Sequence, residues 1–186
     1  VTFTPSGGTP AYCQLEQKPY ATSFIDGTRS YERLTIPTAG VLNPQEGTVE
    51  FWVYIDKELW SAFPAIDIRY PIWNTGLVNN YGTYSLYYHP LSNNIKFRIV
   101  GDDLNTIDAS VGSLDTGWHK FACGWSQQRM YLVIDGTLID EIVNPDLADN
   151  FYKDEIDIGH YNGSGQINTL IDDLRISNRA RTDAEI

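Results

Sequence analysis

The stretch from 117 to 136 constrains the fold more than any other part of the chain. It reads GWHKFACGWSQQRMYLVIDG, with β-forming runs over 118–125 and 130–134 that are joined by a short polar turn. Asp-Gly at the end of the stretch predicts a second tight turn into a strand over 137–142, because such a turn needs positive φ at little cost. The sequence therefore predicts consecutive antiparallel strands in this region.

Alternation within the run 118–125 separates two faces, since successive side chains of a strand point to opposite sides. One face carries residues suited to a core: His119, Phe121, Cys123 and Trp125. The other face is small or charged, and it could meet water or a ligand: Trp118, Lys120, Ala122 and Gly124.

Similar short runs recur along the 186 residues, and no amphipathic helix of useful length interrupts them. Further strands are expected over 21–25, 31–36, 48–55, 72–75, 85–88, 95–100, 108–111, 155–158 and 168–176. Many short strands at regular spacing predict an all-β fold, an antiparallel two-sheet β-sandwich. A chain of this length forms one domain, expected over 1–186 with an N-terminal arm over 1–20.

Three segments resemble laminin-G-like domains of the concanavalin A-like lectin/glucanase superfamily. They are the central hairpin, the run Gly47–Val53, and the closing segment Leu170–Ile186 with its Ile-Asp-Asp-Leu-Arg-Ile core. Their order agrees with the family over roughly 22–186. The resemblance implies a concanavalin A-like jelly roll. The chain opens with Val1 instead of Met, so we interpret it as a fragment of a larger protein.

The net charge of −11 limits the partners that this surface can have. Nucleic acid is disfavoured, because a phosphate backbone demands a basic stripe. No apolar run reaches membrane-spanning length, so membrane insertion is not expected. An acidic surface suits cations or a neutral ligand such as a glycan. The two cysteines, Cys13 and Cys123, make no disulfide framework, and whether they pair stays open.

A carbohydrate-binding platform is the first candidate site. Aromatic rings offer flat apolar surfaces to pyranose rings, and charged side chains offer fixed hydrogen-bonding groups to hydroxyls. If their strands are neighbours, the residues that point away from the core form such a platform: Glu50, Trp52, Tyr54, Tyr87, Lys96, Arg98 and Lys120. The alternative is that the aromatic rings are covered by the long connection 56–71 and that the charges form an ordinary solvated face.

A calcium site is the second candidate. Calcium takes six to eight oxygen ligands, which favours adjacent carboxylates and turn carbonyls. Asp172 and Asp173 in the closing strand and Asp26 in an early turn are the best donors. The family resemblance implies a structural Ca²⁺ near the closing-strand aspartates. The alternative is that one aspartate caps a turn or pairs with Arg175 or Arg29.

A catalytic site is the third candidate and the weakest. Glu155 and Asp157 match the first two positions of Glu-x-Asp-x-x-Glu, which the resemblance to glucanases implies as a signature. His160 stands where the third carboxylic acid belongs, and a neutral histidine does not replace it. The same stretch fits a laminin-G-like strand that ends in Ile-Gly. We therefore predict that the chain is not an enzyme.

These observations favour a non-catalytic binding module that recognises carbohydrate on a cell surface. The run 21–37 resembles segments of bacteriophage tail-associated or receptor-binding proteins, which implies a location in the virion or outside the cell, with the address carried by the parent protein. Two alternatives stay open: a carbohydrate-binding module of a secreted bacterial glycoside hydrolase, and a structural or protein-docking domain.

Overall fold

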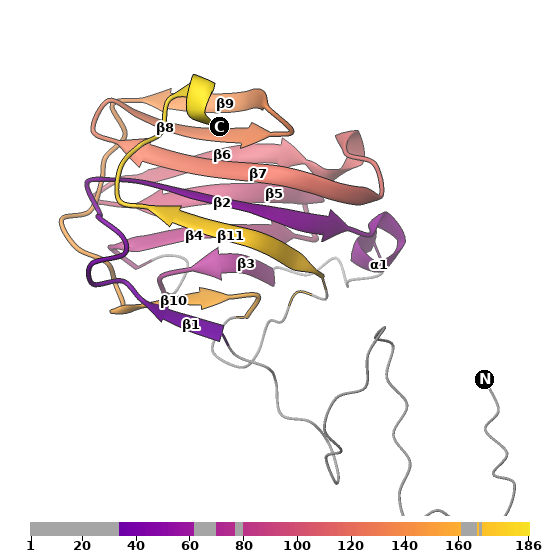
Figure 1. The fold of residues 1–186 in the computed structure, drawn as a ribbon, viewed down its shortest axis with the longest axis horizontal. Helices are drawn as coiled ribbons and strands as arrows, with labels where there is room; N and C mark the ends of the chain where they lie inside the picture. The colour runs from indigo at the N-terminus through magenta and orange to yellow at the C-terminus, as the bar shows by residue number, and fades with distance from the viewer. Residues whose placement is uncertain (1–33, 62–69, 77–79, 161–166, 168) are drawn as a thin grey trace, which may run out of the picture. The chain divides into compact units, whose positions relative to one another are not determined.

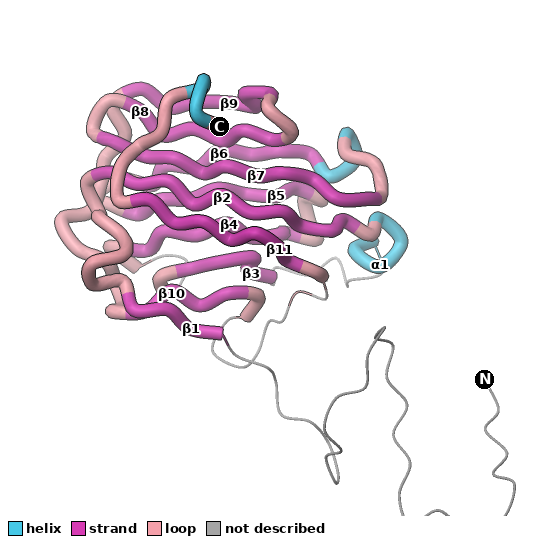
Figure 2. Tube along the Cα trace, viewed as in Figure 1, coloured by secondary structure: helices cyan, strands magenta, loops and turns pink. Residues whose placement is uncertain are grey.

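The computed structural model describes residues 34–61, 70–76, 80–160, 167 and 169–186. Within them two antiparallel sheets pack face to face (Figures 1 and 2). One sheet has six strands in the order β1 (Leu34–Pro37), β10 (Glu155–Ile158), β3 (Tyr70–Asn74), β4 (Thr83–His89), β5 (Asn94–Val100) and β6 (Leu104–Ser110). The other has five in the order β11 (Ile171–Ser177), β2 (Glu46–Ile55), β7 (Gly117–Ser126), β8 (Arg129–Ile134) and β9 (Thr137–Val143). The predicted antiparallel sandwich is confirmed.

Helical segments are short in this part of the chain: α1 (Lys57–Ser61), η1 (Val111–Ser113) and η2 (Asp183–Glu185). None of the helices among the described residues has the length and apolar character of a transmembrane span.

The central hairpin forms as predicted. Strands β7 and β8 pair from Phe121 with Ile134 to Trp125 with Met130. Asp135 and Gly136 then adopt φ values of 51° and 74°, the pair of positive values that a tight hairpin turn requires. On its other side β7 pairs with β2 from end to end. The three strands form the middle of the five-stranded sheet, onto which β9 and β11 add the edges.

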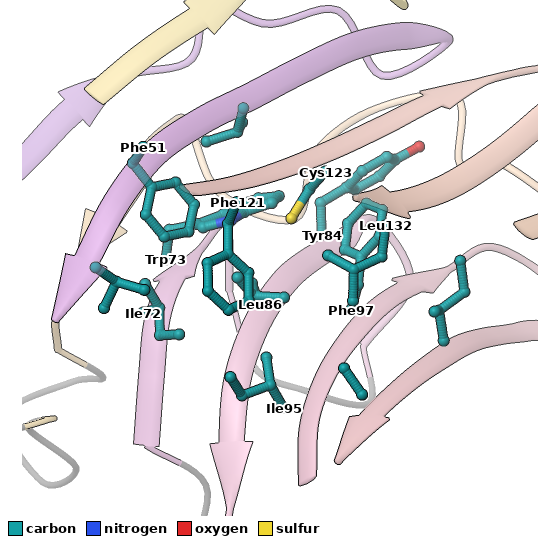
Figure 3. Close-up of a cluster of buried hydrophobic side chains, with 14 of the residues drawn as sticks. Phe51, Ile72, Trp73, Tyr84, Leu86, Ile95, Phe97, Phe121, Cys123 and Leu132 are labelled. Atoms are coloured by element: carbon teal, nitrogen blue, oxygen red, sulfur yellow. The ribbon is translucent and has the colours of Figure 1, made fainter. Parts of the chain in front are cut away.

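The core lies between the sheets and uses the predicted inward faces of β2 and β7. Val49, Phe51, Val53 and Ile55 are all at most 1% exposed. Phe51 stacks on Phe121 with ring centroids 5.8 Å apart, and Trp125 stacks on Trp73 from the opposite sheet at 6.3 Å. Figure 3 shows Phe51 and Phe121 from one sheet and Trp73 from the other converging in this core. Burying a side chain of this size stabilises the fold by about 1.5–3 kcal/mol, so alternation along two strands accounts for much of the sandwich.

Some strands differ from the prediction. The expected 108–111 strand is the end of β6, which pairs with β5 along its whole length. Its letters, LNTIDAS, are too polar to show an alternating pattern, because β6 is an edge strand with one exposed face. The closing strand begins at Ile171 instead of 168. The expected strand 21–25 and the expected arm 1–20 lie outside the described residues.

Cys123 is a free thiol with no exposed surface, packed between the two sheets. Burial raises the pKa of this thiol, which keeps it protonated and unreactive. Cys123 therefore acts as a small hydrophobic residue of the core. Cys13 lies outside the described residues.

Candidate functional site

The residues predicted for the platform lie on two different sheets. Four of them, Glu50, Trp52 and Tyr54 of β2 and Lys120 of β7, lie on the outer face of the five-stranded sheet. The other three, Tyr87 of β4 and Lys96 and Arg98 of β5, belong to the six-stranded sheet. A single platform required all these strands to be neighbours in one sheet, and they are not. Alternation tells which face of a strand a residue occupies, but not which sheet the strand joins.

The group on the six-stranded sheet is closely packed. Tyr87 is 1% exposed and Arg98 9%, and the Arg98 guanidinium lies over the Tyr87 ring at 5.4 Å from its centroid. The Lys96 ammonium pairs with the Asp108 carboxylate at 2.7 Å. This face therefore presents no open aromatic ring at Tyr87 for a ligand to stack on.

The group on the five-stranded sheet builds an exposed surface from two rows of cross-strand neighbours. Trp52 lies between Lys120 of β7 and Asp172 of β11. In the next row Tyr54 pairs with Trp118, and their rings meet edge to face with centroids 5.6 Å apart. Trp52 is 38% exposed and Trp118 45%. We call Trp52, Tyr54 and Trp118 the aromatic surface.

Trp118 was not among the residues predicted for the platform. The signal was present, because alternation in β7 places Trp118 on the same face as Lys120. What was missing is the register of β2 against β7, which sets Trp118 directly opposite Tyr54. Register depends on a partner 64 residues away in the chain and cannot be read from either strand alone.

The tail 178–186 covers the other half of the same face, and in Figure 1 it crosses in front of β2 and β7 to reach β8 and β9. Thr48 donates its hydroxyl hydrogen to the Arg179 carbonyl and accepts a hydrogen bond from the Arg181 amide, both at 2.9 Å. Tyr131 donates to the Arg181 carbonyl at 2.7 Å. Ile186 packs on the small apolar cluster that Ala122, Tyr131 and Val133 form under the tail.

Glu50 lies under this tail and is 2% exposed. Its carboxylate pairs with Lys120 at 3.5 Å and with Arg181 at 3.2 Å. Lys120 lies on the neighbouring strand β7, whereas Arg181 comes from the tail. A carboxylate this buried holds its neighbours in place and does not touch a ligand directly. Lys120, the β7 neighbour of Trp52, also donates to the Ile186 main-chain oxygen at 2.6 Å, so its ammonium is held at Glu50 and at the tail.

The aspartates proposed for calcium are both exposed at the edge strand β11. Asp173 has a φ of 49° at a bulge and holds the Arg175 guanidinium with both carboxylate oxygens, at 3.1 and 2.8 Å. Asp172 accepts the Asp173 amide at 2.8 Å. No cluster of three or more His, Cys, Asp or Glu residues suited to a metal occurs among the described residues. Asp26 lies outside them, and the calcium site stays a prediction.

The three residues that match the glucanase signature in position differ in their exposure to solvent. Glu155 is exposed, whereas Asp157 is fully buried with the Lys153 ammonium 3.1 Å away. His160 is 5% exposed, and its carbonyl oxygen accepts a hydrogen bond from Asn74 at 3.0 Å. Asp157, the second of the matched positions, is thus buried in an ion pair, and only Glu155 of the two matched carboxylates is open to solvent.

A family model described as the concanavalin A-like lectin/glucanases superfamily, laminin G type, matches residues 26–186, and the chain belongs to this family. A search of curated proteins found no match. Among solved structures, the binding domain of botulinum neurotoxin serotype D is similar with a TM-score of 0.56 and 18% identity, over 76% of this chain and 35% of that one. The binding domain of botulinum neurotoxin DC, solved in complex with rat synaptotagmin II, has a TM-score of 0.60 and 20% identity, over 82% and 38%.

This chain thus spans little more than a third of these neurotoxin domains. Identities this low establish the shared fold and nothing finer.

Proposed function

We propose that this domain is a non-catalytic binding module that recognises carbohydrate through its aromatic surface. The observation that carries the proposal is the presence of two exposed tryptophans, Trp52 and Trp118, in successive rows on the outer face of adjacent strands. Large rings this exposed leave apolar area in contact with water, which a stacked pyranose would cover. Lys120 and Asp172 flank Trp52 with a donor and an acceptor for sugar hydroxyls.

The comparisons support the coarser half of this proposal. Both similar neurotoxin structures are binding domains, and one of them was solved in complex with rat synaptotagmin II. We propose by analogy that the partner of this domain lies on a cell surface. The domain itself would then be located outside the producing cell or on a virion. A setting in a bacteriophage tail protein, or in a secreted glycoside hydrolase, belongs to the same proposal.

The test is to screen the protein on a glycan array and then to measure affinities for Trp52→Ala and Trp118→Ala. Each change should weaken binding by about 1–3 kcal/mol, as expected for loss of a stacking ring. Stability should change by less than about 1 kcal/mol, because these side chains are already partly exposed. Tyr152→Ala is the matched control, because it removes a ring that is 46% exposed and lies off this face. Unchanged affinity in both tryptophan variants would contradict the proposal.

Docking of a protein partner is the second candidate, and one residue favours it. Leu170 is 61% exposed, and its carbonyl accepts the Tyr54 amide at 2.9 Å, so an aliphatic side chain borders the aromatic surface. A sugar gains little from such a residue, whereas a protein interface does. Leu170→Ser should therefore weaken a protein complex and leave glycan binding unchanged.

A further inference from the structure

We propose that Asp172 makes the aromatic surface selective for uncharged glycans by repelling anionic ones. This inference rests on the proposed function and adds the ligand class to it. It also gives Asp172 a role that differs from the predicted calcium ligand.

The position of Asp172 follows from the register. Ile171 pairs with Val53, which is fully buried, and Asp172 pairs with Trp52 on the outer face. Directly opposed residues of an antiparallel pair have Cβ atoms about 4.5–5.5 Å apart. A sugar ring stacked on Trp52 therefore lies within reach of the Asp172 carboxylate.

The neighbouring cations are already engaged. Lys120 and Arg181 share the buried Glu50 carboxylate, and Arg175 is held by both oxygens of Asp173. Asp172 accepts a backbone hydrogen bond from Asp173, but in the described part of the chain no cation lies within ion-pair distance of it. Two cations share one carboxylate in that cluster, but the Lys120 ammonium is held at Glu50 and at the Ile186 main-chain oxygen. The exposed charged group that borders Trp52 is therefore the Asp172 carboxylate.

The consequence differs for the two kinds of glycan. A neutral sugar finds in the second carboxylate oxygen an acceptor for a hydroxyl group. A uronic, sialic or sulfated sugar brings a second negative charge to the same place. At an exposed site such a like-charge contact costs about fivefold in affinity, and more where the ligand excludes water.

β-Glucan, mannan and galactan are first tested for binding. Each neutral polymer that binds is then compared with the same polymer after its C6 hydroxyls have been oxidised to carboxylates. Affinities are measured at low salt, in EDTA and in calcium, for the wild type, Asp172→Asn and Asp140→Asn. Asp172→Asn keeps the shape and one acceptor oxygen. Asp140→Asn makes the same change in net charge at an exposed position of the edge strand β9.

The wild type should prefer the neutral polymer by about fivefold or more. In Asp172→Asn this ratio should fall towards one while neutral affinity stays within about twofold, and Asp140→Asn should keep the wild-type ratio. Equal effects of the two variants would overturn the inference, because bulk charge would then explain the preference. Loss of neutral binding in Asp172→Asn that EDTA reproduces would also overturn it, in favour of a calcium ligand. If the wild type bound the oxidised polymers tightly, the selectivity inference would be wrong and the proposed function would stand. If it bound no glycan at all, both would be wrong.

Discussion

Arg181 reaches from the tail to within 3.2 Å of the Glu50 carboxylate, which is buried on the outer face of the five-stranded sheet. Removing the arginine would leave Glu50 with Lys120 alone, at 3.5 Å. Arg181→Met should therefore lower the free energy of unfolding by about 1–3 kcal/mol, as expected for loss of a contact to a buried charge.

Glu50→Gln in the Arg181→Met background provides the check on that coupling. With the charge already gone, the arginine should matter less, so the double variant should be less destabilised than the sum of the single ones. Urea unfolding of all four proteins measures the difference. Additivity within about 0.5 kcal/mol would show that the two residues are not coupled.

Gly124 gives Tyr131 the space to lie across β7. A Cβ atom at this position would lie only 1.9 Å from the Cζ atom of the tyrosine ring, far closer than van der Waals contact allows. Gly124→Ala should displace the ring, break its hydrogen bond to the Arg181 carbonyl and cost about 1–3 kcal/mol. Thermal unfolding should show a much smaller cost in a Tyr131→Ala background. Gly112→Ala is the matched control, because its Cβ would meet nothing nearer than 3.4 Å.

Acid should loosen the tail. Hydrogen bonds from Arg179 and from the Thr182 backbone lower the pKa of Glu185 from 4.5 to about 2. A lowered folded-state pKa means that the carboxylate stabilises the docked tail fully above pH 4.5, and that this contribution is lost as the pH falls towards 2. The Arg181 amide donates a hydrogen bond to the Thr48 hydroxyl. Loosening of the tail should therefore lower the protection of this amide against hydrogen exchange. Glu185→Gln should already be loosened at pH 7, and the protection of this amide should change less between pH 4.5 and 2 than it does in the wild type.

Calcium binding at the closing strand is tested by thermal unfolding in EDTA and in excess calcium. At about a hundred times its dissociation constant, a bound ion would add roughly 2.7 kcal/mol to stability. Asp173→Ala should abolish that gain, and it should also release Arg175. An identical melting temperature in both buffers would remove calcium from the description of this domain.

Hydrolysis is the remaining activity to measure. We expect no turnover of β-glucan, xylan or chitin, since His160 occupies the position of the acid/base carboxylate and Asp157 is paired with Lys153. Turnover that vanishes in Glu155→Gln would contradict this expectation. His160→Glu is the informative companion, because it supplies the missing carboxylate.

The fold could be predicted because its main signals are local. The alternation of Val49, Phe51 and Val53 and the Asp135-Gly136 turn each depend on a few consecutive residues, and both behave as expected. The site was harder, because it depends on which strands become neighbours. Tyr87 and Trp52 have similar local patterns, yet they occupy different sheets. Nothing near Arg181 indicates that its amide binds a hydroxyl 133 residues earlier in the chain.

The Lys120 contact with Ile186 has a practical consequence for handling this domain. A dye, an affinity tag or a surface linker attached close to Ile186 would pull on the main-chain group that holds the ammonium of Lys120, the β7 neighbour of Trp52. Binding curves recorded on protein immobilised in that way would carry an artefact that resembles weak affinity. Attachment at Leu91, which is 60% exposed in the connection between β4 and β5 of the other sheet, would leave the aromatic surface free.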